Sequence, residues 1–121
     1  MREIKILIVE DEVMIAECIK LDLEDEGYTV YDYVTSGEKA VKVTENRETD
    51  LILMDINLSG KIDGIEAAKE IIDRDNIPII FMTGYDENSI FDRAQELHPV
   101  AYLHKPVDIS DLNPILEFIF K

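Results

Sequence analysis

Short runs of apolar, mostly β-branched residues alternate along this chain with segments whose apolar residues recur at helical spacing. The runs lie at Ile4–Val9, Tyr28–Val34, Leu51–Met54, Ile77–Met82 and Val100–Leu103. Strands that are apolar on both sides are typical of a parallel sheet that helices cover on both faces. Five strand–helix units in 121 residues therefore predict a single doubly wound (βα)5 domain of the α/β class over residues 1–121. We expect right-handed crossovers and the strand order 2-1-3-4-5.

Local signals place the helices between these strands. The apolar spacing puts Cys18 on the inner face of the first helix, where we expect it to be buried as a small apolar residue. Gly27 stands where that helix should end, and Ser36 is the expected N-cap of the second helix. Pro114 predicts that the last helix begins close to it, because proline is tolerated only in the first turn.

Composition excludes several classes of protein. The chain has 12 basic and 27 acidic residues and a formal charge of −15, so we expect no direct binding to nucleic acids, which requires basic groups opposite the phosphates. The single cysteine allows no disulfide within the chain. The apolar runs are too short for a signal peptide or a membrane span, and we therefore expect a cytoplasmic protein that does not enter the membrane.

Unusual polar residues collect at the ends of the predicted strands. Glu10 and Asp11 follow the first strand, Asp55 ends the third, Thr83 follows the fourth and Lys105 follows the fifth. Open α/β sheets bind ligands at the carboxyl ends of their strands. In the order 2-1-3-4-5 these four strands are neighbours, so we expect the five side chains to converge. The second strand supplies no such residue and lies at the far edge in that order.

This set of residues suits phosphoryl transfer. Three nearby carboxylates repel one another unless a cation compensates, and Mg²⁺ prefers oxygen ligands that it shares with water and phosphate. Asp11 and Asp55 are the natural direct ligands, and Glu10 would bind directly or through water. Asp55 is the candidate nucleophile, with Thr83 and Lys105 contacting the phosphoryl group. Each residue alone has an ordinary explanation as a helix cap, a turn residue or a solvated charge, but their joint occurrence favours a site.

The ordered segments resemble the receiver domains of response regulators in two-component systems, over essentially the whole chain. The similar segments are Ile6–Glu12, Leu53–Leu58, Asp63–Glu66, Ile79–Gly84 and Tyr102–Pro106. The resemblance implies that Asp55 is the phosphoacceptor and that Mg²⁺, with Mn²⁺ as a substitute, binds Glu10, Asp11, Asp55 and the backbone carbonyl of Asn57. It also implies that Thr83 and Lys105 contact the phosphoryl group and that the Lys105–Pro106 peptide bond is cis.

The same resemblance implies a switch. Tyr102 matches an aromatic residue that follows the Thr83 hydroxyl inward on phosphorylation, although an aromatic residue on a strand is usually core. Asn57 and Tyr85 match positions that tune the rate of hydrolysis. The implied partners are a sensor histidine kinase or a histidine phosphotransfer protein, together with a downstream effector. Phosphorylation-linked homodimerisation would fit the family.

Two other functions stay open, and the chain departs from the family pattern in a loop beside the predicted site. The alternatives are a Mg²⁺-dependent phosphohydrolase, which usually has its nucleophile after the first strand, and a receiver-like interaction module that is never phosphorylated. In the expected function the chain is not an enzyme, although it assists its own phosphorylation and dephosphorylation. The loop between Asp55 and Gly64 is one residue longer than usual, and the usual proline is replaced within Leu58–Lys61. We expect this loop to affect kinase preference or metal geometry.

Overall fold

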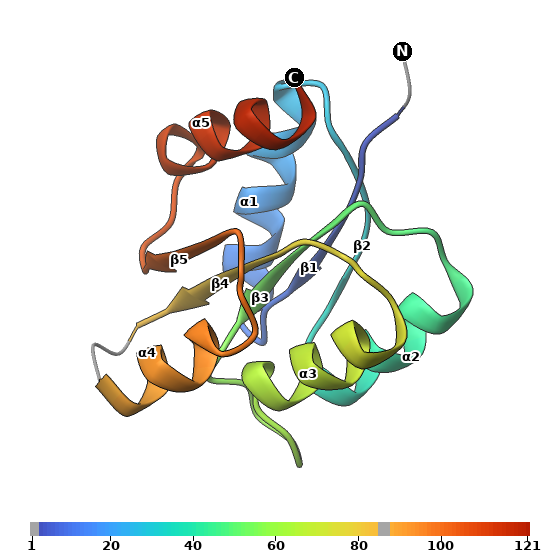
Figure 1. Cartoon of the computed structure of the whole chain (residues 1–121). Coiled ribbons are helices and arrows are strands. Elements are labelled where there is room, and N and C mark those ends of the chain that lie inside the picture. Colours follow the sequence, from blue (N-terminus) through green and yellow to red (C-terminus); the bar gives the residue numbers. More distant parts are fainter. Residues whose placement is uncertain (1–2, 85–87) are drawn as a thin grey trace.

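The computed structural model describes residues 3–84 and 88–121, and its core is one parallel β-sheet. The strands stand in the order β2-β1-β3-β4-β5, as predicted. The elements alternate along the chain as β1 (Lys5–Val9), α1 (Val13–Asp25), β2 (Thr29–Val34), α2 (Gly37–Asn46), β3 (Leu51–Asp55), α3 (Gly64–Arg74), β4 (Ile79–Thr83), α4 (Asn88–Gln95), β5 (Ala101–His104) and α5 (Ile109–Phe120). The predicted α/β, doubly wound fold class is therefore confirmed (Figure 1).

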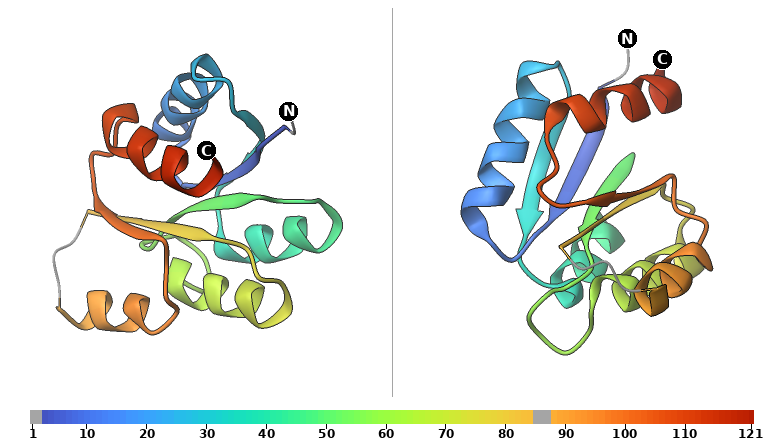
Figure 2. Two further views of the ribbon diagram at one scale, coloured as in Figure 1. Left: turned by 45° about the horizontal axis from the view of Figure 1, so that its top comes forward. Right: turned by 90° about the vertical axis from the view of Figure 1, so that its left-hand side faces the viewer.

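Helices cover both faces of the sheet. Figures 1 and 2 show α1 and α5 on one face and α2, α3 and α4 on the other. Successive side chains of a strand point to opposite faces, so Leu7 and Val9 pack under α2 and α3 while Ile6 and Ile8 pack under α1 and α5. Both sets are fully buried. This double burial is the physical reason why the central strands are apolar at every position.

Several local predictions hold, with small shifts at the ends of elements. Ser36 is the N-cap of α2, and its hydroxyl accepts the Lys39 N–H at 3.2 Å. Gly27 follows the end of α1 with a φ of +94°, a conformation that glycine adopts without steric cost. Asp55 is the last residue of β3, as predicted, while Thr83 is the last residue of β4 rather than the residue after it.

Two expectations about helices are wrong. Cys18 is exposed, because the buried face of α1 runs through Ala16, Ile19 and Leu23, and Cys18 is offset by about one residue from that stripe. Pro114 lies inside α5 rather than in its first turn. The helix begins earlier because Asp108 forms a capping box that satisfies its first N–H groups. In the part of the chain that the structure describes, no helix has both the length and the apolar character needed to cross a bilayer.

Candidate functional site

The carboxyl ends of four adjacent strands bring the predicted residues together. Asp55 ends β3 and Thr83 ends β4, while Glu10 and Lys105 directly follow β1 and β5. Backbone hydrogen bonds continue across these ends, and the Lys105 N–H donates to the Thr83 carbonyl at 2.7 Å. The sheet ladder therefore sets the positions of these side chains.

Three carboxylates form a compact cluster at this edge. Glu10, Asp11 and Asp55 each offer an oxygen within 4.8 Å of the others. Glu10 is 0% and Asp55 is 2% exposed. The Lys105 ammonium lies 2.6 Å from Glu10 Oε1 and 3.0 Å from Asp55 Oδ2. The Lys105 ammonium thus contacts two of the three carboxylates, and the group as a whole keeps an excess of negative charge.

The pKa values reflect this excess. Burial raises the pKa of Glu10 to about 7, Lys105 opposes the rise, and the neighbouring Asp55 adds to it. Burial alone would lower the pKa of Lys105, but its contacts with Glu10 and Asp55 outweigh burial and raise it. The ion pair therefore stabilises the ammonium, while Glu10 tends toward its neutral form near pH 7.

The cluster fits a hard divalent cation. Its donors are carboxylate oxygens, which Mg²⁺ prefers. Glu10 Oε1 is fully buried, and its contact with Lys105 is a short ion pair rather than a well-directed hydrogen bond, so among the described residues it keeps unused accepting capacity. A cation bound here would offset the charge that raises the pKa of Glu10.

Backbone groups of the loop after β3 hold two of the carboxylates. The Asn57 N–H donates to Asp55 Oδ1 at 3.2 Å, and the Ser59 N–H donates to Asp11 Oδ2 at 3.3 Å. The Asn57 side-chain amide lies 3.5 Å from the hydroxyl of the buried Thr83, at the limit of a hydrogen bond. Sequence reasoning missed the contact of Ser59 with Asp11, because backbone amides leave no mark in the residue types.

A family model described as the response regulator receiver domain matches residues 6–117. The chain belongs to this family. Among its relatives, the transcriptional regulatory protein PdtaR of Mycobacterium tuberculosis is 36% identical over 93% of the chain and 55% of that protein. The transcriptional regulatory protein YdfI of Bacillus subtilis is 35% identical over 89% of the chain and 51% of that protein. The chain thus spans about half the length of these relatives.

Solved structures of receiver domains share the fold over nearly their whole length. The signal receiver domain of a modulated diguanylate cyclase from Desulfovibrio desulfuricans G20 is 36% identical with a TM-score of 0.90, over 97% of this chain and 93% of that one. A CheY-like receiver domain from Methylobacillus flagellatus is 33% identical with a TM-score of 0.86, over 98% and 99% of the two chains. The likeness therefore extends to the receiver architecture as a whole.

Tyr102, the aromatic residue predicted to take part in the switch, contacts α4. Tyr102, in the middle of β5, is half-buried and meets the ring of Phe91 in α4 edge-on, with 5.1 Å between the ring centroids. The ring of Tyr102 also lies edge-on to that of His104, with 5.8 Å between the ring centroids. The Lys105–Pro106 peptide bond is cis. Tyr85, the second residue assigned to rate tuning, lies outside the described residues.

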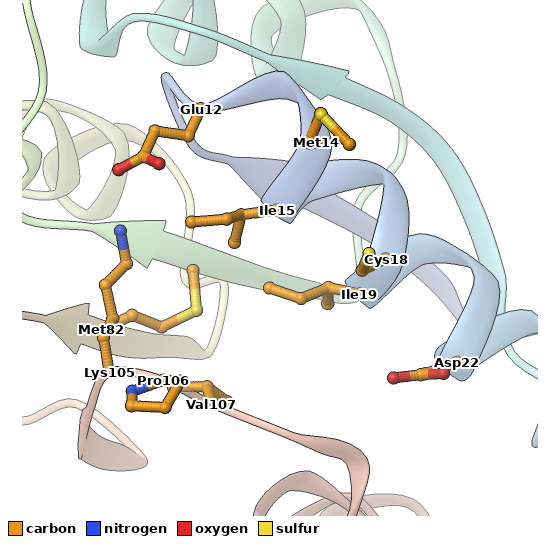
Figure 3. Close-up of a pocket in the computed structure, with 10 residues that line it drawn as sticks. All are labelled: Glu12, Met14, Ile15, Cys18, Ile19, Asp22, Met82, Lys105, Pro106 and Val107. Atoms are coloured by element: carbon orange, nitrogen blue, oxygen red, sulfur yellow. The ribbon is translucent and has the colours of Figure 1, made fainter.

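An apolar groove borders the receiver's site on the side of α1. It has a volume of about 540 Å³. Figure 3 shows α1 along one side and the segment Lys105–Val107 on the other. Met82 lies on the floor, and Glu12 stands at the same end as the Lys105 ammonium (Figure 3). The groove thus opens directly beside Lys105, which contacts the carboxylate cluster, and the exposed Cys18 lies in its wall.

Proposed function

We propose that residues 1–121 form one receiver domain that accepts a phosphoryl group on Asp55 in the presence of Mg²⁺. The observation that carries the proposal is the cluster itself, in which a buried aspartate shares an edge with two further carboxylates and contacts the ammonium of Lys105. Family membership supports the same reading. Glu10, Asp11, Asp55 and the backbone carbonyl of Asn57 would hold the Mg²⁺, and Mn²⁺ is an expected substitute.

The phosphodonor is a phosphohistidine of a sensor histidine kinase or of a histidine phosphotransfer protein. A carboxylate oxygen of Asp55 attacks the phosphorus atom, the P–N bond breaks, and the donor imidazole keeps the electron pair and takes up a proton. When bound by these residues, Mg²⁺ would neutralise part of the negative charge on the phosphoryl oxygens. The groove beside Lys105 offers the donor domain an apolar contact surface next to Asp55.

Residues of the chain stabilise the acyl phosphate and later allow its hydrolysis. Lys105, already 3.0 Å from Asp55, would pair with a phosphoryl oxygen, and the buried Thr83 hydroxyl would donate to another. Asn57 and Tyr85 would tune the hydrolysis that resets the domain. The chain would thus assist its own phosphorylation and dephosphorylation without being an enzyme for a separate substrate.

The output is a shift between two arrangements of the α4–β5–α5 face. Movement of Thr83 toward the phosphoryl group would allow Tyr102 to turn inward, away from Phe91. A decisive shift of such an equilibrium requires about 5 kcal/mol of differential stabilisation. Several charge-assisted hydrogen bonds supply energies of this order.

The downstream partner would read that face rather than use this domain to contact nucleic acid, since the formal charge is −15. The relatives PdtaR and YdfI are named transcriptional regulatory proteins, and the matched region covers 55% and 51% of their lengths. We therefore propose an effector in another protein or another segment, with phosphorylation-linked dimerisation as one mode of control. We also propose a cytoplasmic location, where sensor kinases present their phosphohistidine.

Intact-mass analysis after incubation with acetyl phosphate and Mg²⁺ tests the proposal. We expect one base-labile phosphoryl adduct that disappears in Asp55→Asn and in the presence of a chelator. If no adduct forms, and beryllofluoride does not bind either, the unphosphorylated interaction module becomes the better account. Repeated turnover of a small phosphoester would instead favour the phosphohydrolase.

A further inference from the structure

The loop between β3 and α3 is hydrogen-bonded to α2, a helix that supplies none of the predicted site residues. The loop projects from the body of the molecule at the carboxyl edge of the sheet (Figures 1 and 2). Its Ile62 N–H donates to Glu38 Oε1 at 3.1 Å, and Glu38 belongs to the first turn of α2. The longer form of this loop, noted from the sequence, therefore has a partner of its own in α2.

A second contact joins the same carboxylate to the loop. Gly60 has a φ of +116°, and a Cβ placed on it would lie 2.8 Å from Glu38 Oε2. The backbone of Gly60 thus passes closely over the Glu38 carboxylate. Next to it, the side chain of Ile62 packs against Gly37, where an added Cβ would lie 3.0 Å from Cγ1 of Ile62 and 3.0 Å from Cβ of Ala67. The carboxylate and this apolar contact together hold one end of the loop.

The other end of the loop reaches the acidic cluster. Asn57 donates its backbone N–H to Asp55, and Ser59 donates its backbone N–H to Asp11. Only two residues, Gly60 and Lys61, separate Ser59 from Ile62, so a shift of the anchored end moves the Ser59 amide as well. Contacts therefore run continuously from Glu38, through the loop, to Asp11.

We propose that Glu38 is a positioning residue for the cation site, holding the extended loop so that the Ser59 N–H orients the Asp11 carboxylate. The proposal rests on the Mg²⁺-dependent function proposed above. Glu38 is not itself a ligand, because it is engaged with the loop on the surface of α2. It acts through the hydrogen bond that it accepts, and its negative charge is incidental to that role.

The test compares Glu38→Ala and Glu38→Gln with the unchanged 121-residue chain. Both variants remove one negative charge, but only Gln keeps an oxygen that can accept the Ile62 N–H. Mg²⁺ binding is measured by isothermal titration calorimetry at fixed pH and ionic strength. Partners one step beyond metal ligands typically affect affinity by about 10- to 100-fold, and for the more remote Glu38→Ala we expect a Kd about 3- to 10-fold higher. Glu38→Gln should stay within about 2-fold of the unchanged chain, since its acceptor remains.

A second readout follows the loop directly. Without Mg²⁺, the amide of Ser59 should exchange with solvent faster in Glu38→Ala than in Glu38→Gln, as measured by NMR. Gly60→Ala presses on the same carboxylate and should also weaken Mg²⁺ binding. Its effect should shrink in the Glu38→Ala background, because the atom that its Cβ meets is then gone.

The outcomes separate this inference from the proposed function. If the unchanged chain binds Mg²⁺ and Glu38→Ala binds it equally well, the inference is wrong and the proposed function stands. The inference is also wrong if Gln and Ala weaken binding alike, since charge would then explain the effect, or if the exchange of the Ser59 amide does not change. If the unchanged chain binds no Mg²⁺, both fall together.

Discussion

Gly64→Ala tests how closely the start of α3 approaches the predicted phosphoacceptor. Gly64 is the first residue of α3, and its N–H donates to the Ile56 carbonyl at 2.8 Å. A Cβ added here would lie 2.1 Å from the backbone oxygen of Asp55 and 2.8 Å from Cα of Ile56. These are backbone atoms at the end of β3, which is held between β1 and β4 on both sides. The strand cannot yield, so the helix must move.

The size of the effect follows from that displacement. Relief of the closest contact, between the added carbon and the Asp55 oxygen, requires a shift of more than about 1 Å, since non-bonded heavy atoms prefer separations of about 3.5 Å. Overpacking of this kind costs about 1–3 kcal/mol, and loss of the Gly64–Ile56 hydrogen bond adds about 1 kcal/mol. We therefore expect Gly64→Ala to lower the free energy of unfolding by about 2–4 kcal/mol. For a domain of this size that corresponds to a Tm lower by roughly 10 °C.

Gly27→Ala is the matched control. Gly27 has a positive φ, and a Cβ there would meet nothing within 4 Å, so only backbone strain of about 1 kcal/mol is expected. Urea unfolding of both variants measures the difference between their free energies of unfolding, with the dependence on urea concentration (the m-value) taken from the unchanged chain. Equal losses at Gly64 and Gly27 would refute the reasoning, because the close approach to Asp55 would then carry no energetic weight.

Further predictions concern the charged residues of the cluster and one hydrogen bond between α3 and α2. Because the pKa of Glu10 is raised to about 7, the folded chain binds more protons than the unfolded chain between about pH 4.5 and 7, and the free energy of unfolding without Mg²⁺ should fall by up to about 3 kcal/mol as pH rises through this window. In Glu10→Gln, urea unfolding at several pH values should show that this fall in unfolding free energy is absent. Mg²⁺ should raise Tm more at pH 8 than at pH 5, since protons compete for the same carboxylates; an equal rise would argue against the site. In Lys105→Met the free energy of unfolding should continue to fall to a higher pH than in the unchanged chain, because the ion pair that opposes protonation of Glu10 is lost. Arg74→Ala should lower the unfolding free energy by about 1 kcal/mol more than Lys69→Ala on the same helix, since only Arg74 donates to Thr44 in α2, at 2.7 Å.

The fold was predictable because its main determinant is local and repeated. Each apolar run marks a strand that is buried on both faces, and each helical stripe marks a helix that covers one of them. Ends of elements were less predictable, because the ladder hydrogen bonds continue through polar residues such as Asp55 and Thr83. The start of α5 was placed too late because the capping box at Asp108 outweighs the one hydrogen bond that Pro114 cannot make inside the helix.

The site was partly predictable for a related reason. The carboxyl edge is where the apolar strands stop, so residues with polar side chains at those positions stand out against their neighbours. Glu10, Asp55, Thr83 and Lys105 were visible in this way. Once the strands are known to be parallel, their order alone brings these four residues to one edge of the sheet, where Glu10 and Asp55 form the carboxylate cluster with Asp11.

What supports the cluster could not be read from residue types. Glu38 is an exposed glutamate in the first turn of a helix, a place where an acidic residue is favourable without any further role. Its relation to Asp11 exists only because the backbone of the extended loop joins them, through an N–H at Ile62 and another at Ser59. Backbone amides are present at every residue other than proline, so their use at one place becomes visible only in three dimensions. A site of this kind therefore has a set of side chains that sequence can predict and a backbone support that only the fold can assign.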